Sequence, residues 1–285
     1  MELSVIEVQL RSLLNKISNG EAVEVSDQAI EDFGEQMKDA VRKQLTPRDP
    51  SFRIRASNVG RSLCVLQKQK EGAEAEPMPY NHVVRMLIGD SLEAIIRLLM
   101  TTAGVQVTSD GDQVKLEVSG VPIKGESDID INGKVYDIKS CSPWAFKNKW
   151  AQGYDGLKKD DSFGYVGQLY LYADAQNKEP GGWIVVDKSS GELMVVEVSD
   201  DAHSAEEVRK ERQYKVEAIS NNAPFRRGYE PQDEYFRRKA TGDKVLHTNC
   251  RFCNYKKSCW PTAVYRPSKM SSPDAKSPGM KWFTD

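Results

Sequence analysis

Three charged side chains of a predicted β-hairpin have the types and spacing of a metal-dependent phosphodiester-cleaving site. Asp128 precedes the pair Asn132-Gly133, and Asp137 and Lys139 follow it. Asn-Gly between two strands is a strong hairpin signal, and alternate residues of a strand share a face. The two carboxylates should therefore converge beside the lysine, where they would suit Mg²⁺ or Mn²⁺. Such an ion polarises a phosphoryl oxygen, and a lysine can neutralise the developing negative charge.

The same residue types also have an ordinary explanation. An Asp-x-Lys triplet on a strand is common, and Asp128 could be a charge that only keeps the hairpin soluble. Glu93, on the helix predicted for residues 80–100, is a plausible third carboxylate or a solvated helix charge. Gln168 and Tyr172 are four residues apart on a later predicted helix and hence share a face. They could hydrogen-bond a phosphate or hold the lysine, although Gln168 could equally be an ordinary exposed residue.

Four of the five cysteines have a spacing that indicates metal chemistry. Cys250, Cys253 and Cys259 follow one another closely, and Cys64 stands far earlier in the chain. Sets of four thiolates bind iron–sulfur clusters or zinc. Zinc sites usually pair two Cys-x2-Cys units, and this arrangement of one and three does not. The fifth cysteine, Cys141, is expected to be a small buried apolar residue.

The order of these motifs resembles the PD-(D/E)xK nuclease superfamily, and within it the RecB-like branch. The matching residues are Gly125 and Asp128, then Asp137 and Lys139, then the pair Gln168 and Tyr172. The resemblance covers roughly residues 50–265. Many relatives carry a histidine on the first helix. This chain has Glu93 at the corresponding place, and phage-type exonucleases likewise have a glutamate there.

The resemblance implies a site and a cofactor. The metal ligands would be Glu93, Asp128, Asp137 and the backbone carbonyl of Ile138, and Lys139, Gln168 and Tyr172 would complete the catalytic set. The cysteine pattern is similar to that of the iron–sulfur nucleases, among them CRISPR-associated exonucleases and AddB-type subunits. A [4Fe–4S] cluster held by Cys64, Cys250, Cys253 and Cys259 is therefore expected, with Zn²⁺ as the alternative.

The elements that must position these residues alternate between helices and strands. Hydrophobic periodicity predicts helices within residues 1–45 and at 80–100, 162–175 and 201–220. It predicts strands at 105–108, 113–118, 127–131, 134–141, 183–187 and 193–198. This order favours an α/β (α+β) fold with a central mixed sheet flanked by helices, and the resemblance adds a restriction-endonuclease-like core. We expect a helical N-terminal region at 1–50, the nuclease core with its cluster-binding segments at 51–265, and a flexible tail at 266–285.

Composition limits the function classes. The chain has 285 residues, of which 39% are hydrophobic, and its net charge is −2, which neither requires nor excludes a nucleic-acid ligand. No apolar run could span a membrane, and the N-terminus lacks the pattern of a secretory signal, so a reducing cytoplasm is expected. Basic and aromatic residues near the motifs are candidates for DNA contacts, with a solvated surface or core packing as the alternative: Arg53, Arg55, Arg61, Lys147, Lys149, Trp144 and Trp150.

These observations predict a metal-dependent DNA exonuclease. Single-stranded DNA or DNA ends would be its substrate, and recombination, replication or repair of the phage or mobile-element type would be its setting, with protein partners from those processes. The alternative is a non-cleaving DNA-binding or assembly subunit, for example in CRISPR adaptation, that keeps the nuclease fold.

Overall fold

The computed structural model describes the chain except residues 1–3, 48, 50, 237, 270–278 and 285. The chain divides into two compact units, each made of two separate stretches of sequence. Unit 1 comprises residues 1–61 and 79–217, and unit 2 comprises residues 62–78 and 218–285. This division does not follow the three consecutive segments that the sequence predicts. None of the described helices combines the length and apolar character that a membrane-spanning helix requires.

Unit 1 is built on a five-stranded mixed sheet with the order β1-β4-β5-β6-β7. Strands β5 and β6 are parallel, and the other neighbours are antiparallel. Strands β2 and β3, which come between β1 and β4 in the sequence, form a separate two-stranded hairpin. The strands are β1 (Val107–Asp110), β2 (Gln113–Val118), β3 (Val121–Glu126), β4 (Ile129–Ile131), β5 (Lys134–Cys141), β6 (Glu179–Asp187) and β7 (Leu193–Glu197).

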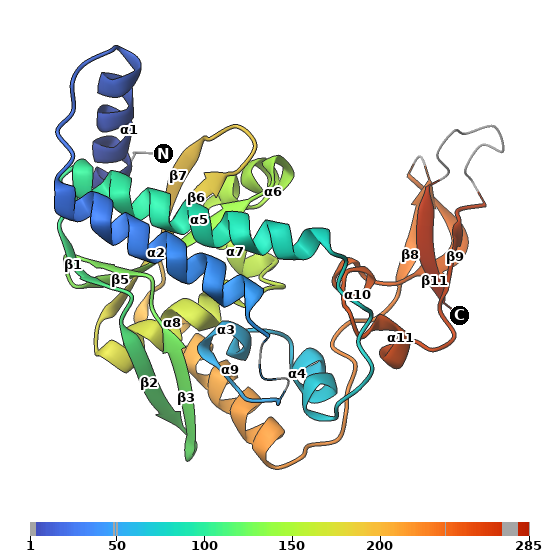
Figure 1. The fold of residues 1–285 in the computed structure, drawn as a ribbon. Helices are drawn as coiled ribbons and strands as arrows, with labels where there is room; N and C mark the ends of the chain where they lie inside the picture. The colour runs from blue at the N-terminus through green and yellow to red at the C-terminus, as the bar shows by residue number, and fades with distance from the viewer. Residues whose placement is uncertain (1–3, 48, 50, 237, 270–278, 285) are drawn as a thin grey trace. The chain divides into compact units, whose positions relative to one another are not determined.

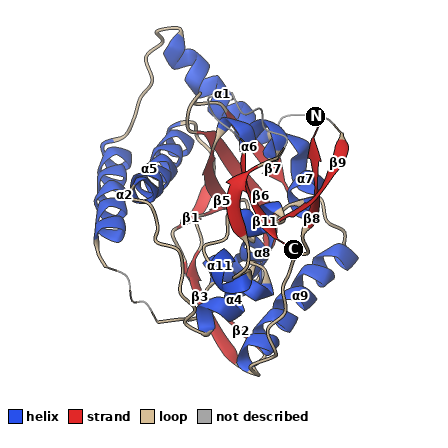
Figure 2. Cartoon of the chain, turned by 90° about the vertical axis from the view of Figure 1, so that its right-hand side faces the viewer, coloured by secondary structure: helices blue, strands red, loops and turns tan. Residues whose placement is uncertain are grey.

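Helices cover both faces of this sheet (Figures 1 and 2). On one face, α1 (Val5–Ser18) and α5 (Asn81–Thr102) contribute to a core with strands β4 to β7. On the other face lie α6 (Pro143–Asn148), the 3-10 helix η1 (Trp150–Gln152), α7 (Gly153–Lys159) and α8 (Tyr165–Gln176). The predicted central mixed sheet with flanking helices is therefore confirmed.

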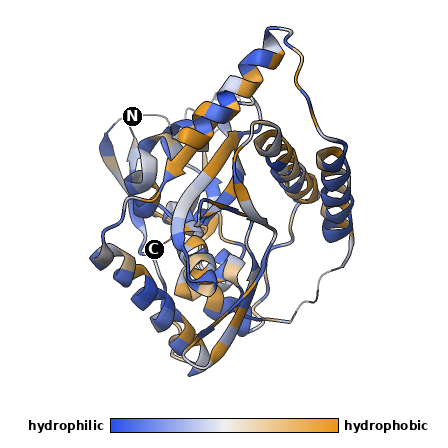
Figure 3. Cartoon of the chain, turned by 90° about the vertical axis from the view of Figure 1, so that its left-hand side faces the viewer, coloured by the Kyte–Doolittle hydropathy of each residue, from blue (hydrophilic) through white to orange (hydrophobic). Residues whose placement is uncertain are grey.

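The remaining helices of unit 1 lie around this core. Helix α2 (Asp27–Leu45) packs along α5, which is visibly richer in hydrophobic residues (Figure 3). The short α3 (Ala56–Val59) contacts α8, and α9 (Ala202–Ser220) begins in unit 1 and ends in unit 2. Helices α1 and α2 both lie in the segment 1–50, for which the sequence predicts a helical region.

Strand β5 divides its side chains between the two cores. Val135 and Cys141 belong to the core on the α8 side, whereas Tyr136 and Ile138 belong to the core on the α5 side. Because side chains alternate along a strand, Asp137 and Lys139 point toward α8. The burial pattern of β5 thus fixes the face on which the charged residues must lie.

Unit 2 contains a four-stranded antiparallel sheet and three short helices. The sheet order is β10-β11-β9-β8, with β8 (Gln232–Phe236), β9 (Lys239–Val245), β10 (Val264–Pro267) and β11 (Met280–Thr284). The helices are α4 (Leu63–Lys70), α10 (Thr248–Arg251) and α11 (Lys256–Cys259). Strand β11 falls in the segment for which the sequence predicts a flexible tail, and it pairs with both β10 and β9. Residues 270–278 of that predicted tail lie outside the described residues.

Candidate active site

Asp137 and Lys139 form an ion pair on β5. The Lys139 Nζ lies 2.6 Å from the Asp137 Oδ2, and the Asp137 side chain is fully buried. Burial raises the pKa of Asp137 well above its usual range, although the charge of Lys139 opposes the shift. Burial also lowers the pKa of Lys139, but the carboxylates of Asp137 and Asp128 outweigh this effect, and the net shift is upward. The lysine is therefore held in its charged form.

Asp128 joins this pair across the β4–β5 hairpin. Its Oδ2 accepts a hydrogen bond of 2.8 Å from the backbone N–H of Ile138. Its carboxyl group also lies against that of Asp137 and raises the pKa of Asp137 further. The Asn132-Gly133 turn, with φ values of 53° and 77°, closes the hairpin that brings the three side chains together. The predicted convergence of Asp128, Asp137 and Lys139 is thus observed.

The two carboxyl groups have the character of a cation site. Apart from the ammonium of Lys139, no donor among the described residues reaches either oxygen of Asp137. Two adjoining buried carboxyl groups both stay ionised only beside positive charge, and Lys139 supplies one such charge for the two of them. Within the described chain, no group of three or more His, Cys, Asp or Glu side chains is arranged to hold a metal ion. One or two carboxylates are nevertheless the usual protein contribution to Mg²⁺, whose other ligands are waters and phosphate oxygens.

Glu93 reaches the same region from α5. Its Oε1 accepts a hydrogen bond of 2.8 Å from Arg97. Burial and the charge of Asp128 raise the pKa of Glu93, and the charges of Arg97 and Lys139 oppose that shift. Glu93 is therefore electrostatically coupled to the hairpin, but its carboxylate is paired with an arginine. The backbone of Ile138 faces the Asp128 side of the strand, since its N–H bonds that residue.

Gln168 and Tyr172 extend the site from α8. The Gln168 Nε2 donates to the Tyr172 Oη over 2.8 Å, as their spacing of four residues allows. Burial raises the pKa of Tyr172, and the carboxylates of Asp137 and Asp128 raise it further. The tyrosine ring packs so closely on β3 that a Cβ on Gly125 would lie 2.9 Å from it and 2.5 Å from the Ala56 Cβ. The glycine of the Gly125-x-x-Asp128 motif is thus required by packing.

Tyr165 is a component of the site that sequence reasoning missed. Its ring centroid lies 5.6 Å from the Lys139 Nζ, within range of a cation–π interaction. The Asp161 carboxylate places Tyr165 by accepting backbone hydrogen bonds from the three residues that begin α8, Gly164, Tyr165 and Val166. The sequence indicates only the start of this helix, since an aspartate shortly before a helix often caps it; it does not indicate the contact of Tyr165 with Lys139.

Two of the predicted DNA-contacting residues, Trp150 and Lys149, are buried. Trp150 is 2% exposed, stacks on Tyr165 and contacts Trp183 at a tilt of 52°, so it is a core residue. Lys149 is also buried, with its Nζ near the rings of Phe163 and Tyr165. Both residues are buried because they lie where the apolar core on the α8 side continues into η1.

The other predicted DNA-contacting residues lie nearer the surface. Trp144 is 67% exposed, and Lys147 is exposed on the same helix. Arg53 and Arg55 are exposed, Arg53 pairs with Asp49, and Arg61 is half-buried. The structure leaves these residues wholly or partly accessible to solvent.

Unit 2 contains all four cysteines that the sequence groups together. Cys64 lies on α4, Cys250 on α10 and Cys259 at the end of α11, with Cys253 between the last two helices. All five cysteines are in the described chain, and none forms a disulfide. Burial, together with the thiols of Cys64, Cys253 and Cys259, raises the pKa of Cys250 to about 11.

Cys259 is also influenced by thiols of this group. Burial, together with the thiols of Cys253 and Cys64, raises the pKa of Cys259 to about 11. The four sulfurs therefore lie in one region of unit 2. Among the described residues, however, they are not arranged as a group of metal ligands. Cys141, in contrast, is a buried residue of β5 in unit 1, as predicted.

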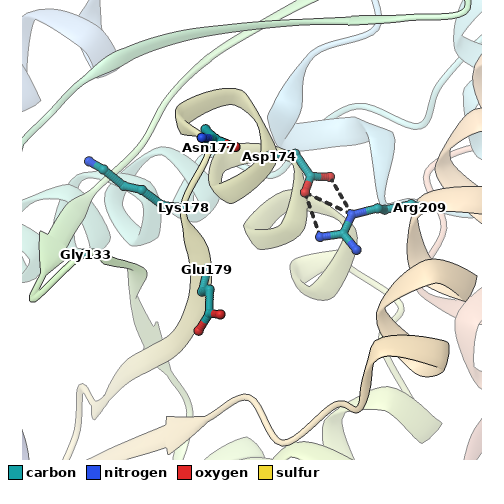
Figure 4. Close-up of a pocket in the computed structure, with 6 residues that line it drawn as sticks. All are labelled: Gly133, Asp174, Asn177, Lys178, Glu179 and Arg209. Carbon is teal, nitrogen blue, oxygen red and sulfur yellow. Dashed lines mark hydrogen bonds and ion pairs between the residues drawn. The ribbon is translucent and has the colours of Figure 1, made fainter.

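A separate surface pocket lies at the other end of β5, next to the hairpin turn. It is lined by Gly133, Asp174, Asn177, Lys178, Glu179 and Arg209 (Figure 4). Asp174 pairs there with Arg209 at 2.9 Å, and Lys178 pairs with Asp130. Since these charges neutralise one another, the pocket has no feature that adds to the candidate site.

Comparison with known proteins gives little further guidance. The sequence matches no protein-family model, and no curated protein matches it. Among solved structures, the chain is similar to one titled "Crystal structure of SSO0001", at 14% sequence identity and a TM-score of 0.42. The match covers 78% of this chain and 93% of that one.

Proposed function

We propose that this protein is a metal-dependent DNA nuclease of the RecB-like branch of the PD-(D/E)xK superfamily. One observation carries the proposal: Asp128, Asp137 and Lys139 come together from two strands of one hairpin. Folding alone does not require a fully buried carboxylate beside a second one, because burying charge is costly even when one lysine pairs with it. Hydrolysis of a phosphodiester bond, in contrast, needs both a cation site and a positive side chain at the same place.

The residues of this site would divide the work as follows. Asp128 and Asp137 would hold Mg²⁺ or Mn²⁺, with Glu93 and the Ile138 carbonyl as further candidate ligands. The ion would supply Lewis acidity toward a phosphoryl oxygen. Lys139 would offset the negative charge that develops on the scissile phosphate, since its raised pKa keeps the ammonium protonated. Tyr172, hydrogen-bonded by Gln168, would hold the carboxylates and the lysine in register.

For the fold, we propose a restriction-endonuclease-like core within unit 1, and for the cysteines a [4Fe–4S] cluster, with Zn²⁺ as the alternative. Cys64, Cys250, Cys253 and Cys259 would be its ligands, and four thiols in one region fit either group chemically. The cluster would tie residues 62–78 to the C-terminal part of unit 2. Its role would be structural, because closing a long loop otherwise costs chain entropy.

The substrate that we propose is single-stranded DNA or DNA ends, degraded as by an exonuclease. Recombination, replication or repair of the phage or mobile-element type is the proposed setting, with protein partners from those processes. A non-cleaving DNA-binding or assembly subunit is the second candidate. It is favoured by one contact, the 2.6 Å ion pair in which Lys139 and Asp137 already neutralise each other.

Purified protein and end-labelled DNA test this proposal. Anaerobically handled protein should degrade single-stranded or double-stranded DNA with Mn²⁺ or Mg²⁺ and not with EDTA. Lys139→Met keeps much of the side-chain volume beside Tyr165 but removes the charge, so the rate should fall by about 100-fold or more. Lys134→Met is the matched control, because Lys134 is exposed on the same strand. Degradation that is equal in the two variants, or independent of metal, would refute the assignment.

A further inference from the structure

A ladder of aromatic rings runs from the core of unit 1 to its surface beside Lys139. Trp183 is fully buried and lies 6.0 Å from Trp150, centroid to centroid. Trp150 stacks on Tyr165 at 5.5 Å and an interplanar angle of 28°. Tyr165 stacks in turn on Phe163 at 5.5 Å and 18°. The ladder therefore ends at Phe163, whose ring is nearly parallel to the ring beneath it.

Phe163 is exposed although it belongs to a tightly held loop. Its exposed fraction is 57%. Asp161 accepts three backbone hydrogen bonds of 2.8–3.0 Å from the residues that follow Phe163. Gly164 has φ +80° and sits against the Gly60 backbone, where a Cβ would come within 2.2 Å. The loop thus holds a large apolar side chain toward solvent, and the hydrophobic effect gives no reason for that placement.

The charge around the ladder suits a nucleic acid. Tyr165 contacts both the Phe163 ring and the ammonium of Lys139, so it separates them by a single ring. Lys149 places its Nζ 5.8 Å from the Phe163 centroid and 5.9 Å from that of Tyr165. An aromatic face next to the ammonium of Lys139 can receive a base on the ring and its phosphate at that lysine, and the buried Lys149 adds positive potential beneath the platform.

We propose that Phe163 is a stacking platform for an unpaired nucleobase adjacent to the phosphate at Lys139. This inference rests on the proposed function for the identity of the ligand. A base can lie on the ring only if it has left a duplex stack, so the platform favours single strands and frayed ends over intact duplex. Phe163 is in this sense a specificity-determining residue.

Binding without cleavage tests the platform. The probes are fluorescein-labelled oligothymidylate and an abasic oligonucleotide of the same length, which has the same phosphates but no bases. Fluorescence anisotropy in EDTA should show that the wild-type protein prefers the thymidylate. Phe163→Ala and Phe163→Leu should weaken thymidylate binding by about 5-fold or more, the usual loss for one stacked base, with little effect on the abasic probe. Phe163→Trp should retain the preference.

Tyr214→Ala is the matched control, since Tyr214 on α9 is 60% exposed. Thermal unfolding of each variant verifies the fold. A wild-type protein without base preference, or Phe163 variants that keep it, would overturn the platform. A Phe163-dependent preference in a protein that does not cleave DNA would remove the proposed nuclease activity and leave the platform standing. A protein that cleaves DNA, but whose preference for thymidylate over the abasic probe is the same in every variant, would keep the nuclease activity and overturn the platform.

Discussion

At the scale of single residues, Asp137 is the residue that packing explains least. It is fully buried, its pKa is raised by burial, and its immediate neighbours are a second carboxylate and one lysine. A valine there would join the same core as Val135 without any desolvation cost. In the proposed function the chemistry requires this charge, and the supporting residues should then be sensitive to small displacements.

Gly125 provides a test of that sensitivity. In Gly125→Ala the new Cβ would meet the Ala56 Cβ at 2.5 Å and the Tyr172 ring at 2.9 Å. We expect overpacking to lower the free energy of unfolding by about 1–3 kcal/mol and to reduce DNA degradation by displacing Tyr172. Gly34→Ala is the control, because nothing lies within 4 Å of its Cβ on α2, and it should stabilise the protein by about 0.5–1 kcal/mol. Urea denaturation of both variants measures the difference, and equal effects would contradict the packing role.

At the scale of elements, Asp200 connects the loop after β7 to α7 and to α8, the helix that carries Tyr165, Gln168 and Tyr172. Its carboxylate accepts hydrogen bonds from Lys158 at 2.7 Å, Tyr154 at 2.5 Å and Tyr170 at 2.8 Å. Burial raises the pKa of Asp200, but these three donors outweigh burial and hold the pKa below its usual value. The interaction fixes α7 and α8 against each other, and α8 carries Tyr172 and Tyr165.

Asp200→Asn should therefore destabilise unit 1 by about 2 kcal/mol at neutral pH, as expected for hydrogen bonds to a charged acceptor. Because the folded pKa lies below the unfolded value of about 3.9, the stabilisation is complete above that value. It is lost as the pH falls through the folded pKa. The difference between wild type and variant should thus shrink below about pH 4. Asp155→Asn, exposed on α7, serves as control, and a pH-independent difference in unfolding free energy would contradict this role.

Elements with a local signal were predictable from the sequence, and those that depend on distant partners were not. The residue ranges of β2 and β5 match the predictions, since alternation and the Asn132-Gly133 turn specify them locally. Strand β3 was missed because Pro122 and Gly125 interrupt its pattern. Strands β8 and β9 are largely polar, and β11 pairs with β9 across a long stretch of sequence. The position of Tyr165 beside Lys139 follows from the packing of α8 on β5, which no local pattern encodes.

At the scale of the whole molecule, the chain separates the candidate hairpin site from the cysteines. Unit 1 holds Asp128, Asp137 and Lys139, whereas all four grouped cysteines lie in unit 2. Unit 2 is small and joins two distant stretches of the chain, so a metal group would stabilise it more than its own core can. Each unit should therefore respond separately to loss of its own cofactor.

Cys64→Ser tests this separation. Loss of one thiolate should remove the visible absorbance, iron and labile sulfide from protein purified without oxygen, and should lower the unfolding temperature of unit 2. Cys141→Ala, in unit 1, should retain all three signals. Zinc in place of iron in the wild-type protein would favour the zinc alternative. Wild-type protein without metal, or a Cys64→Ser variant with full metal content, would contradict a cysteine-held cofactor.

The most direct measurement is the single-turnover rate of DNA hydrolysis by Asp137→Asn in Mn²⁺, set beside its unfolding free energy without metal. The substitution keeps the shape of a fully buried side chain and removes its charge. We predict a rate at least about 1,000-fold below wild type, because several kcal/mol of charge stabilisation are lost. The unfolding free energy should be unchanged or higher, since Asp128 still balances Lys139 after the second buried carboxylate has been removed. A variant that hydrolyses DNA at the wild-type rate, or that loses activity only together with its fold, would contradict the assignment of Asp137 to the chemistry.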